Sequence, residues 1–521
     1  MTIGAFEVSK TRRKWQVALA TIYCLLSAGV VFGYAAIKPV LIAEGVYRDR
    51  CTDDELDRDV RVCFGQELHL NFMFTCAAVA TNVCALPVGT ILDKYGPRVS
   101  GMLGAGFFAA GCLLFAFAWE LPFDAYIPAY LFLALGGPFV FISSFQLSNT
   151  FPTSSGLILS LLTGAFDASS AVFLIYRLIY FASGETFWPK KFFLVYLIVP
   201  VFTFLSQVFV MPRESYKTVG ELVHMVEEDQ YHSSDEELPA EVRHSVQEER
   251  RASVASEIDL LLGPKGGERH QKRETAKKHI SGVWGALHGK TAREQITSWW
   301  FVLITAFTVI QMTRINYFVA TIRPQYTYLL GSYEDAVEIN NFFDIALPMG
   351  GLVAVPFIVK GLSGALLDRT STTFIIGLLV ATATAIGILG ILPYKWAAYL
   401  NVILFVVYRP LYYTTVSDYA AKVFGFVTFG KVYGTIICLA GLFNFVQSGL
   451  DALTYTVFGK NPVPVNVILQ VSAMVVGTAL VAYISFQSKK MKRDELVREA
   501  ESAEETAMPV HLGFGESSYT Q

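Results

Sequence analysis

Arg409 is an ionisable residue deep inside a long apolar stretch, residues 396–417. At the rise of an α-helix, about 1.5 Å per residue, it lies about 20 Å from the start of that stretch and cannot easily reach either end. An always protonated guanidinium group can hold a carboxylate through two hydrogen bonds. Pro410, the next residue, loosens a helix and frees a backbone acceptor. Arg409 therefore either binds a substrate carboxylate or forms a structural ion pair with a neighbouring acid.

Asp167 lies at a comparable depth, about 18 Å from the start of the apolar stretch 155–181 at the same helical rise. A carboxyl group in such a place is costly, which makes it a functional candidate. It could be a proton-coupling acid, a partner for Arg409 or a ligand for a substrate amine; the alternative is a buried acid held neutral. The equivalent position 277 residues later is Asn444, so the carboxylate has an amide counterpart.

Gly29 and Gly33 lie one helical turn apart in the apolar stretch 16–38, directly before Tyr34. Small residues at this spacing are typical of closely packed helices. They can also let a helix unwind and expose backbone groups to a zwitterionic ligand, as discontinuous helices of transporters do. Both interpretations stay open.

Further polar residues stand toward the ends of two other apolar stretches. Residues 298–320 end with Arg314, Asn316 and Tyr317, and residues 429–452 carry Gln447 and Asp451 beyond Asn444. Any of them could line a vestibule or merely bridge neighbouring helices.

The elements that position these residues must be membrane-spanning helices. Of the 521 residues 53% are hydrophobic and 16% are charged, against ~45–50% and ~25% in soluble proteins. A spanning helix needs ~20 mostly apolar residues. Twelve stretches meet this requirement: 16–38, 67–91, 99–118, 125–148, 155–181, 190–211, 298–320, 339–362, 371–392, 396–417, 429–452 and 464–486. We predict an all-α polytopic membrane protein with six spans on each side of a polar stretch.

A short motif occurs twice, at the end of the second span of each half. The copies are Gly89-x-x-x-Asp93-Lys94, with Arg98 downstream, and Gly364-x-x-x-Asp368-Arg369, which begins 275 residues later. In the first copy the acid and the bases can pair in a tight turn at the membrane surface. The repetition predicts a two-fold repeated protein.

This doubled motif resembles the signature of the major facilitator superfamily, Gly-x-x-x-Asp-Arg-x-Gly-Arg-Arg between spans two and three, which often recurs weakened between spans eight and nine. Here Lys94 replaces the first Arg, Pro97 stands at the second, and the second copy lacks the downstream glycine. The resemblance implies two pseudo-symmetric six-helix bundles that rock about a central cavity. It also implies that the motif residues act as a gate through inter-helix contacts that are made in one orientation only.

The charge pattern predicts orientation and domain boundaries. Lys10, Arg12, Arg13 and Lys14 precede the first span, which favours a cytoplasmic start by the positive-inside bias, and both termini are predicted cytoplasmic. The stretch 213–297 and the tail have too few apolar residues to fold alone and are predicted to be disordered. The predicted domains are a terminus 1–14, a bundle 15–212, a linker 213–297, a bundle 298–487 and a tail 488–521.

Cys51 and Cys63 are the two of seven cysteines that lie outside the predicted spans. Both fall in the first loop on the non-cytoplasmic side, which is oxidising at a plasma or vacuolar membrane. A disulfide between them is one hypothesis, and two free thiols are the alternative.

A narrower resemblance is carried by the run from Phe32 to Leu41, which continues through Glu44 to Tyr47 and on to Cys51. It resembles the system-L facilitative amino-acid transporters of the same superfamily. The resemblance implies sodium-independent movement of large neutral amino acids by alternating access, although a relative in that branch carries purine nucleobases. The substrate-binding residues expected on this reading are Gly29, Gly33, Tyr34, Asp167, Arg314, Asn316, Tyr317, Arg409, Tyr412 and Asn444.

The sequence contains no phosphate-binding Gly-x-x-x-x-Gly-Lys-Ser/Thr loop, no His-Glu-x-x-His and no paired Cys-x-x-Cys. We therefore expect no enzyme, no cofactor or metal and no nucleic-acid partner, but a monomer whose partners are a small-molecule substrate and the lipid bilayer. One alternative is a proton-coupled transporter or exporter of a small organic metabolite or nucleobase, with Asp167 as its acid. Another is a non-transporting nutrient receptor that signals through the charged linker.

Overall fold

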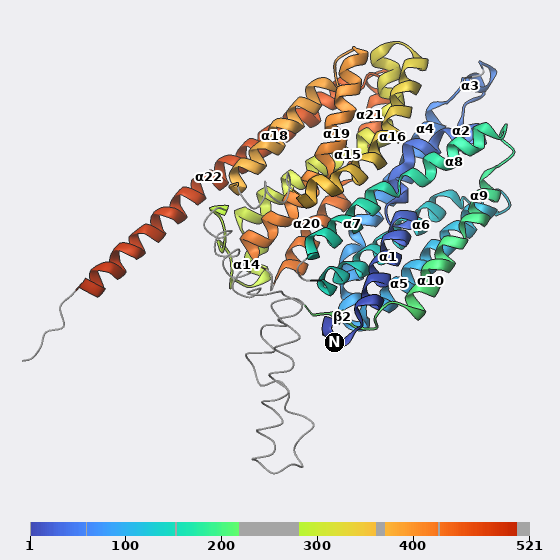
Figure 1. Ribbon diagram of the computed structural model, residues 1–521. Helices are drawn as coiled ribbons and strands as arrows, with labels where there is room; N and C mark the ends of the chain where they lie inside the picture. The colour runs from blue at the N-terminus through green and yellow to red at the C-terminus, as the bar shows by residue number, and fades with distance from the viewer. Residues whose placement is uncertain are drawn as a thin grey trace, which may run out of the picture.

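The computed structural model is a bundle of long helices in two groups that lie side by side, the first half of the chain in blue to green and the second in yellow to red (Figure 1). The structure describes residues 2–58, 60–151, 154–217, 281–360, 370–425 and 428–507, and in some helical segments, among them 351–360, the backbone only. The Ser233 and Arg250 regions of the charged linker lie outside these residues.

The first group is built from nine α-helices and one 3-10 segment that correspond to the six predicted spans. They are α1 (Lys10–Ser27), η2 (Val30–Gly33), α2 (Tyr34–Ala43), α4 (Phe64–Val83), α5 (Ala85–Phe117), α6 (Tyr126–Ser144), α7 (Ser155–Ala168), α8 (Ala171–Ala182), α9 (Pro189–Tyr196) and α10 (Ile198–Phe209). Helix α5 contains a break at Gly96, whose φ of 82° is a left-handed value that glycine adopts freely. This break separates the second span from the third, as the tight turn of the motif predicts.

The second group follows the same plan. Its helices are α14 (Ala292–Ile296), α15 (Trp299–Leu330), α16 (Tyr333–Lys360), α18 (Thr372–Leu389), α19 (Lys395–Phe424), α20 (Phe429–Phe443), α21 (Val446–Thr456) and α22 (Val463–Ala507). Among the described residues, ten segments are long and apolar enough to cross a membrane. Helices α16 and α19, with 28 and 30 residues, are also long enough and supply the eighth and tenth predicted spans.

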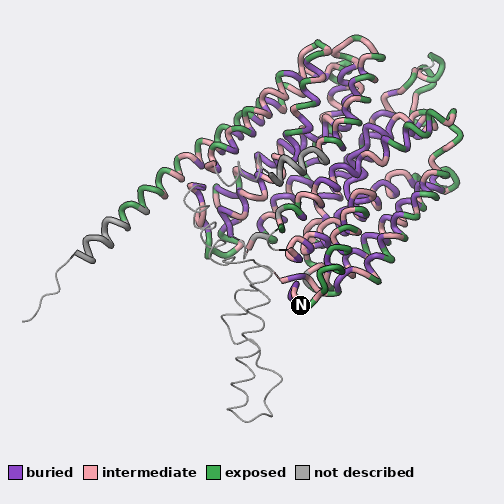
Figure 2. Tube along the Cα trace, in the orientation of Figure 1, coloured by how far each residue is buried: buried purple, intermediate pink, exposed green. Residues whose placement is uncertain are grey.

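The folded part extends beyond the predicted domain boundaries. Thr2–Ile3 (β1) pairs in parallel with Ser215–Tyr216 (β2), and Gln295 of α14 donates hydrogen bonds to the carbonyls of Leu287 and Phe424. Helix α22 continues to Ala507, and most of the described side chains of residues 489–497 are exposed (Figure 2). These contacts require residues that are distant in sequence, which explains why linker-like composition did not reveal them.

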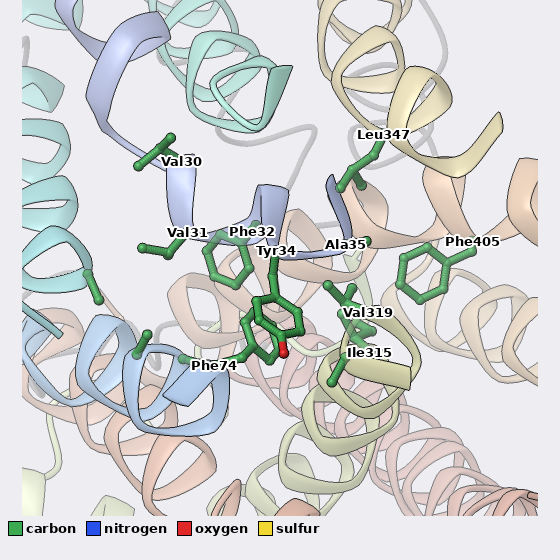
Figure 3. Packing of buried hydrophobic residues seen from close by; sticks show 14 of the residues in the cluster. Val30, Val31, Phe32, Tyr34, Ala35, Phe74, Ile315, Val319, Leu347 and Phe405 are labelled. Atoms are coloured by element: carbon green, nitrogen blue, oxygen red, sulfur yellow. The ribbon is translucent and has the colours of Figure 1, made fainter. Parts of the chain in front are cut away.

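Buried residues fill the interior of both groups and the seam between them (Figure 2). Helix α16 packs along α7, and α20 packs along α4. Figure 3 shows the seam, where Tyr34 and Phe74 of the first half lie near Ile315 and Val319 of the second. The two groups therefore share one continuous apolar core.

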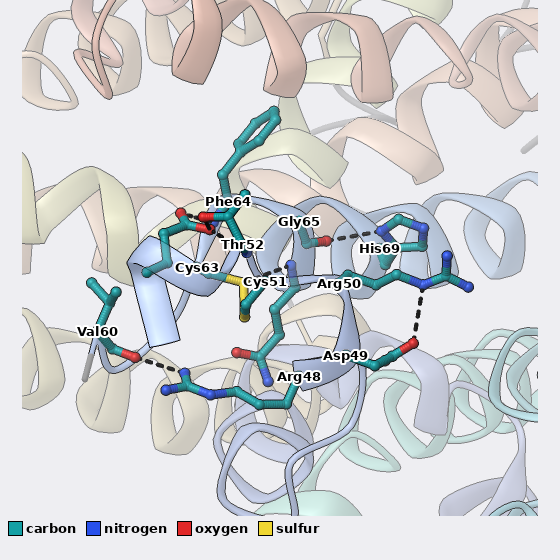
Figure 4. Close-up of a disulfide and its surroundings, with 12 residues drawn as sticks. Arg48, Asp49, Arg50, Cys51, Thr52, Val60, Cys63, Phe64, Gly65 and His69 are labelled. Carbon is teal, nitrogen blue, oxygen red and sulfur yellow. Dashed lines mark hydrogen bonds and ion pairs between the residues drawn. A yellow bond between two sulfur atoms is a disulfide. The ribbon is translucent and has the colours of Figure 1, made fainter. Parts of the chain in front are cut away.

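The loop between α2 and α4 marks one end of the molecule, which we call the disulfide end, and the β1–β2 pair lies toward the opposite, N-terminal end (Figure 1). A disulfide joins Cys51 to Cys63, with Cα atoms 5.5 Å apart (Figure 4). Backbone N–H groups of Thr52 and Phe64 donate to the Glu55 carboxylate and lower its pKa. The loop is thus closed by a covalent bond and by a charged cap.

Candidate functional site

A cavity of about 930 Å³, which we call the central cavity, lies between the two halves, toward the disulfide end. Its walls come from α2, the outer parts of α15 and α21, and the loops after α21 and after the short helix α3 (Asp53–Asp57). Charged residues in the walls include Lys38, Glu67, Arg323 and Asp451. The volume lies in the usual range for a small-molecule site, roughly 300–1,000 Å³.

One wall of this cavity carries two carboxylates and a single lysine. Lys38 forms a buried ion pair with Glu67, and its ammonium also donates to the side-chain oxygen (Oδ1) of Asn71 at 2.8 Å. The Asn71 amide donates to the Asp451 carboxylate at 2.6 Å, which bridges the two halves. The other Asp451 oxygen has no hydrogen-bond partner within the described residues, and Asp451 has no ion-pair partner among them. Within the described residues, Asp451 is thus the acid of this wall that has no positively charged partner.

The facing charge is Arg323, near the disulfide end of α15. It lines the cavity, and no acid of the described residues lies within 4.0 Å of its guanidinium group. The nearest comparable acid, Asp344, is occupied, because it accepts from Arg177 at 2.5 Å and from Asn340 at 2.7 Å. Arg61, which lies over the Tyr333 ring, and Lys460 also line the cavity. Within the described residues, Asp451 is therefore an acid of this cavity without an ion-pair partner, and Arg323 is one of three basic residues there without one.

Arg409 and Asp167 meet across the two halves, one turn beyond the cavity along the first span. The Arg409 Nη1 donates to the Asp167 Oδ1 at 2.8 Å, and both side chains are almost fully buried. The guanidinium carbon lies 4.6 Å from the centre of the Phe32 ring. Of the interpretations left open for these two residues, the structure contains the ion pair. The arginine Nε keeps no partner in the described residues.

The glycine pair combines both features expected of it. The first span leaves the α-helix between Ala28 and Tyr34, and a Cβ added at Gly29 or Gly33 would lie 2.5 Å from a backbone carbonyl oxygen of the fifth span. The Gly29 N–H is already used, because it donates to the Ser169 hydroxyl at 2.8 Å. The glycines therefore allow close packing at an unwound segment.

The predicted aromatic residues occupy different environments. Tyr34 is fully buried, stacks on Phe74 with ring centroids 4.8 Å apart (Figure 3), and lies under the Lys38 ammonium. Tyr317 lines the central cavity, and its hydroxyl lies 2.9 Å from the Thr454 hydroxyl. Tyr412 is buried in the second half, where its hydroxyl donates to the Thr308 carbonyl oxygen. The structure brings only Tyr317 of these three to the cavity surface.

The remaining predicted polar residues do not gather at one place. Both side-chain atoms of Asn316 are buried without a partner among the described residues, as is the Asn444 oxygen. Asn444 ends α20, where the eleventh span breaks before α21 begins. Arg314 faces a different, smaller cavity inside the second half.

The motif proposed as a gate is only partly described. Arg98 donates two hydrogen bonds to the Met211 carbonyl oxygen, just beyond the end of α10, and Lys94 lies 5.3 Å from the Tyr95 ring centre. A Cβ at Gly89 would meet nothing within 4 Å. Gly364, Asp368, Arg369 and the side chain of Asp93 lie outside the described residues.

Sequence reasoning missed Lys38, Glu67 and Arg323, although a signal for two of them exists. A basic residue followed by proline occurs inside three helices, at Lys38 in the ten-residue α2, at Arg323 in α15 and at Arg409 in α19. Proline cannot donate a backbone hydrogen bond, so each basic residue lies at a weakened point of its helix. All three basic side chains lie at the seam between the halves.

The chain belongs to the Major Facilitator Superfamily, whose family model matches residues 19–450. It is thus a polytopic membrane transporter and not an enzyme. The fold of two six-helix bundles, predicted from twelve apolar stretches and a doubled motif, is confirmed.

Two of the three curated relatives described next carry the name of a transporter. Over 495 residues the chain is 44% identical to Protein FMP42 of Saccharomyces cerevisiae, covering 92% of this chain and 96% of that protein. It is 23% identical to Equilibrative nucleobase transporter 1 of Bos taurus, over 86% of this chain and 90% of that one. It is 30% identical to human Large neutral amino acids transporter small subunit 3, but over only 32% of each chain.

The chain shares its fold with a solved structure from work on substrate recognition in proton dependent oligopeptide transporters. The TM-score of this match is 0.52 and the sequence identity is 13%. The match covers 93% of this chain and 100% of that one.

Proposed function

We propose that this protein moves large neutral amino acids across a membrane by alternating access, without a coupling ion. The observation that carries the proposal is the charge arrangement of the central cavity. Arg323 and Asp451 both line it and neither has an ion-pair partner among the described residues. A zwitterion would complement them, with its carboxylate toward Arg323 and its ammonium group toward Asp451. Charge-assisted hydrogen bonds of this kind are the strong ones.

The same arrangement favours facilitated movement. A zwitterion has no net charge, so it satisfies one cation and one anion of the cavity together and needs no sodium ion or proton for balance. The side chain of the substrate would lie against the apolar and aromatic wall, to which Val319, Ile322, Tyr317 and Tyr455 contribute.

The deeper pair, Arg409 and Asp167, would act later in the cycle. As the halves rock, the substrate carboxylate would compete with Asp167 for the Arg409 guanidinium group, which lies at the midplane where such repeats place their sites. Gly29, Gly33, Tyr34, Asn316, Tyr412 and Asn444 would shape the path around this pair. The motif residues Gly89, Asp93, Lys94, Arg98, Gly364, Asp368 and Arg369 would form the gate at the cytoplasmic, N-terminal end. The membrane would be vacuolar or plasma membrane.

The test is counterflow in proteoliposomes of the purified chain, with equal pH on both sides and no sodium. Labelled leucine should exchange against leucine, isoleucine, phenylalanine and methionine. Arg323→Gln and Asp451→Asn should each raise the KM for leucine at least tenfold, because each removes a charge-assisted bond of ~1.5–3 kcal/mol. Arg58→Gln is the matched control, since Arg58 is exposed and pairs with Asp54, which lies four residues earlier in the short helix α3.

A nucleobase is the second candidate, because one full-length relative carries that name. Adenine exchange without leucine exchange, and with little effect of Arg323→Gln or Asp451→Asn, would overturn the amino-acid proposal. Leucine flux that requires a pH gradient would overturn the facilitative mode and favour Asp167 as a coupling acid.

A further inference from the structure

A second cavity, of about 50 Å³, lies inside the second half between α15, α18, α19 and α22. Arg314 lines it together with Gln311, Asn401 and Tyr408. It is separate from the central cavity, although Tyr317 and Gln325 line both. These two residues therefore form part of a shared wall.

Arg314 is the charged group of this cavity, and neutral groups surround it. Its guanidinium donates to the Gln470 side-chain oxygen at 2.6 Å, to the Ala383 carbonyl at 3.0 Å and to the Gln311 side-chain oxygen at 3.3 Å. No acid of the described chain lies within ion-pair distance of it. By contrast, Lys38, Arg177 and Arg409 each pair with a buried acid. An uncompensated guanidinium away from water is costly.

The cavity is also lined by side-chain hydrogen-bond donors that have no acceptor among the described residues. The Gln311 amide nitrogen and the Tyr408 hydroxyl are buried, line the cavity and have no partner among the described residues. Both side chains are only 2% exposed. The amide nitrogen of Gln470, the residue that accepts from Arg314, is likewise without a partner. A half-buried cation and these unused donors thus lie in one place, beside one unpartnered acceptor of the described residues, the Asn401 side-chain oxygen. The excess of donors favours an anion.

The helix packing leaves space for the Gln470 side chain beside Arg314. A Cβ added at Gly387 would lie 1.8 Å from the Gln470 side-chain oxygen, so glycine is what allows Gln470 to reach Arg314. A single ordered water needs ~10–15 Å³, so a cavity of about 50 Å³ has space for one halide ion together with a few water molecules.

We propose that this cavity binds a small monovalent anion of chloride size, held by Arg314, Gln311 and Tyr408. The anion supplies the missing negative charge and accepts from the unused donors. Because Tyr317 and Gln325 lie between the two cavities, anion and substrate affect each other's binding, and the coupling is reciprocal.

The experiment measures thermal unfolding of the full chain in detergent while chloride replaces gluconate at constant ionic strength. A ligand that binds the folded state raises the Tm in a saturable way. The wild type should show this rise. Arg314→Gln, which removes the charge, and Gly387→Ala, which displaces Gln470, should each raise the apparent Kd for chloride at least tenfold. Gly377→Ala on the same helix is the matched control, because its Cβ would meet nothing within 4 Å.

Two results would overturn the proposal. One is a wild-type Tm that is the same in chloride and in gluconate throughout the series, which would mean that water alone fills the cavity. The other is a wild-type chloride response in Arg314→Gln. If that variant does not fold, Gly387→Ala decides, and an unchanged chloride response there counts against the site.

Discussion

At the scale of single residues, the seam is organised by how each buried charge is neutralised. Asp167 is balanced by Arg409, Glu67 by Lys38 and Asp344 by Arg177. Arg323 and Asp451 in the central cavity and Arg314 in the smaller cavity are among the charged groups that have no ion-pair partner in the described residues. Function is therefore expected where this balance is incomplete, whereas the pairs Arg409–Asp167 and Arg177–Asp344 join the two halves.

The pair of Arg409 and Asp167 gives a prediction at this scale. Arg409→Met should lower thermal stability by about 3–5 kcal/mol, because it leaves Asp167 buried without its cation. The double variant Arg409→Met/Asp167→Leu should recover most of that loss, since apolar residues can replace a buried ion pair at little cost. Leucine counterflow should be absent in both. A wild-type Tm for Arg409→Met alone would show that Asp167 does not depend on Arg409.

The sequence identified Arg409 and Asp167 because each is a lone charge in a long apolar run. An ion pair between them was one of several interpretations. The two residues lie on different halves, and the distance between them depends on how the halves pack together. Arg323 was missed for a related reason: it follows the predicted span 298–320, whereas the helix continues to Leu330. A charged residue that follows the predicted end of a span is not counted as part of that helix, so it is not considered as a candidate inside the membrane.

At the scale of elements, spans one, five and eleven are interrupted at similar places. From Gly29 and Gly33 the sequence offered the first interruption as one of two open interpretations, and it did not indicate the others. In span five the Ser169 and Ser170 hydroxyls bond to carbonyls three residues earlier, where α7 ends and α8 has yet to begin. Serines are common in unbroken membrane helices, so their presence alone does not indicate a break.

The close approach of spans one and five predicts a large effect from a single methyl group. Gly33→Ala should destabilise the protein by roughly 1–3 kcal/mol, because its Cβ would lie 2.5 Å from the Ser170 carbonyl oxygen, a backbone atom that cannot move aside. Gly106→Ala in α5 is the matched control, since its Cβ would meet nothing within 4 Å. Thermal unfolding of both variants measures the difference. Equal Tm values would contradict the packing role.

At the scale of the whole molecule, the structure is one state of the transport cycle. The large cavity is at the disulfide end, while α4 and the start of α5 pack against α20 on the other side of the midplane. A Cβ at Gly441 would lie 2.7 Å from the Asn82 Cβ, which shows how closely these helices meet. Alternating access requires this contact to open when the cavity closes.

A reversible cross-link tests that requirement. A Cβ at Gly434 would lie 3.5 Å from the Leu86 Cγ, so Leu86→Cys/Gly434→Cys should form a disulfide under mild oxidation that locks α20 to α5. Leucine counterflow should then fall at least tenfold and return after reduction, because the halves can no longer separate at the N-terminal end. The single variants and the wild type, treated identically, control for the free Cys84 and Cys438 and for reduction of the Cys51–Cys63 bond. Unchanged flux through fully cross-linked protein would mean that the helices stay together throughout the cycle and that the substrate passes elsewhere.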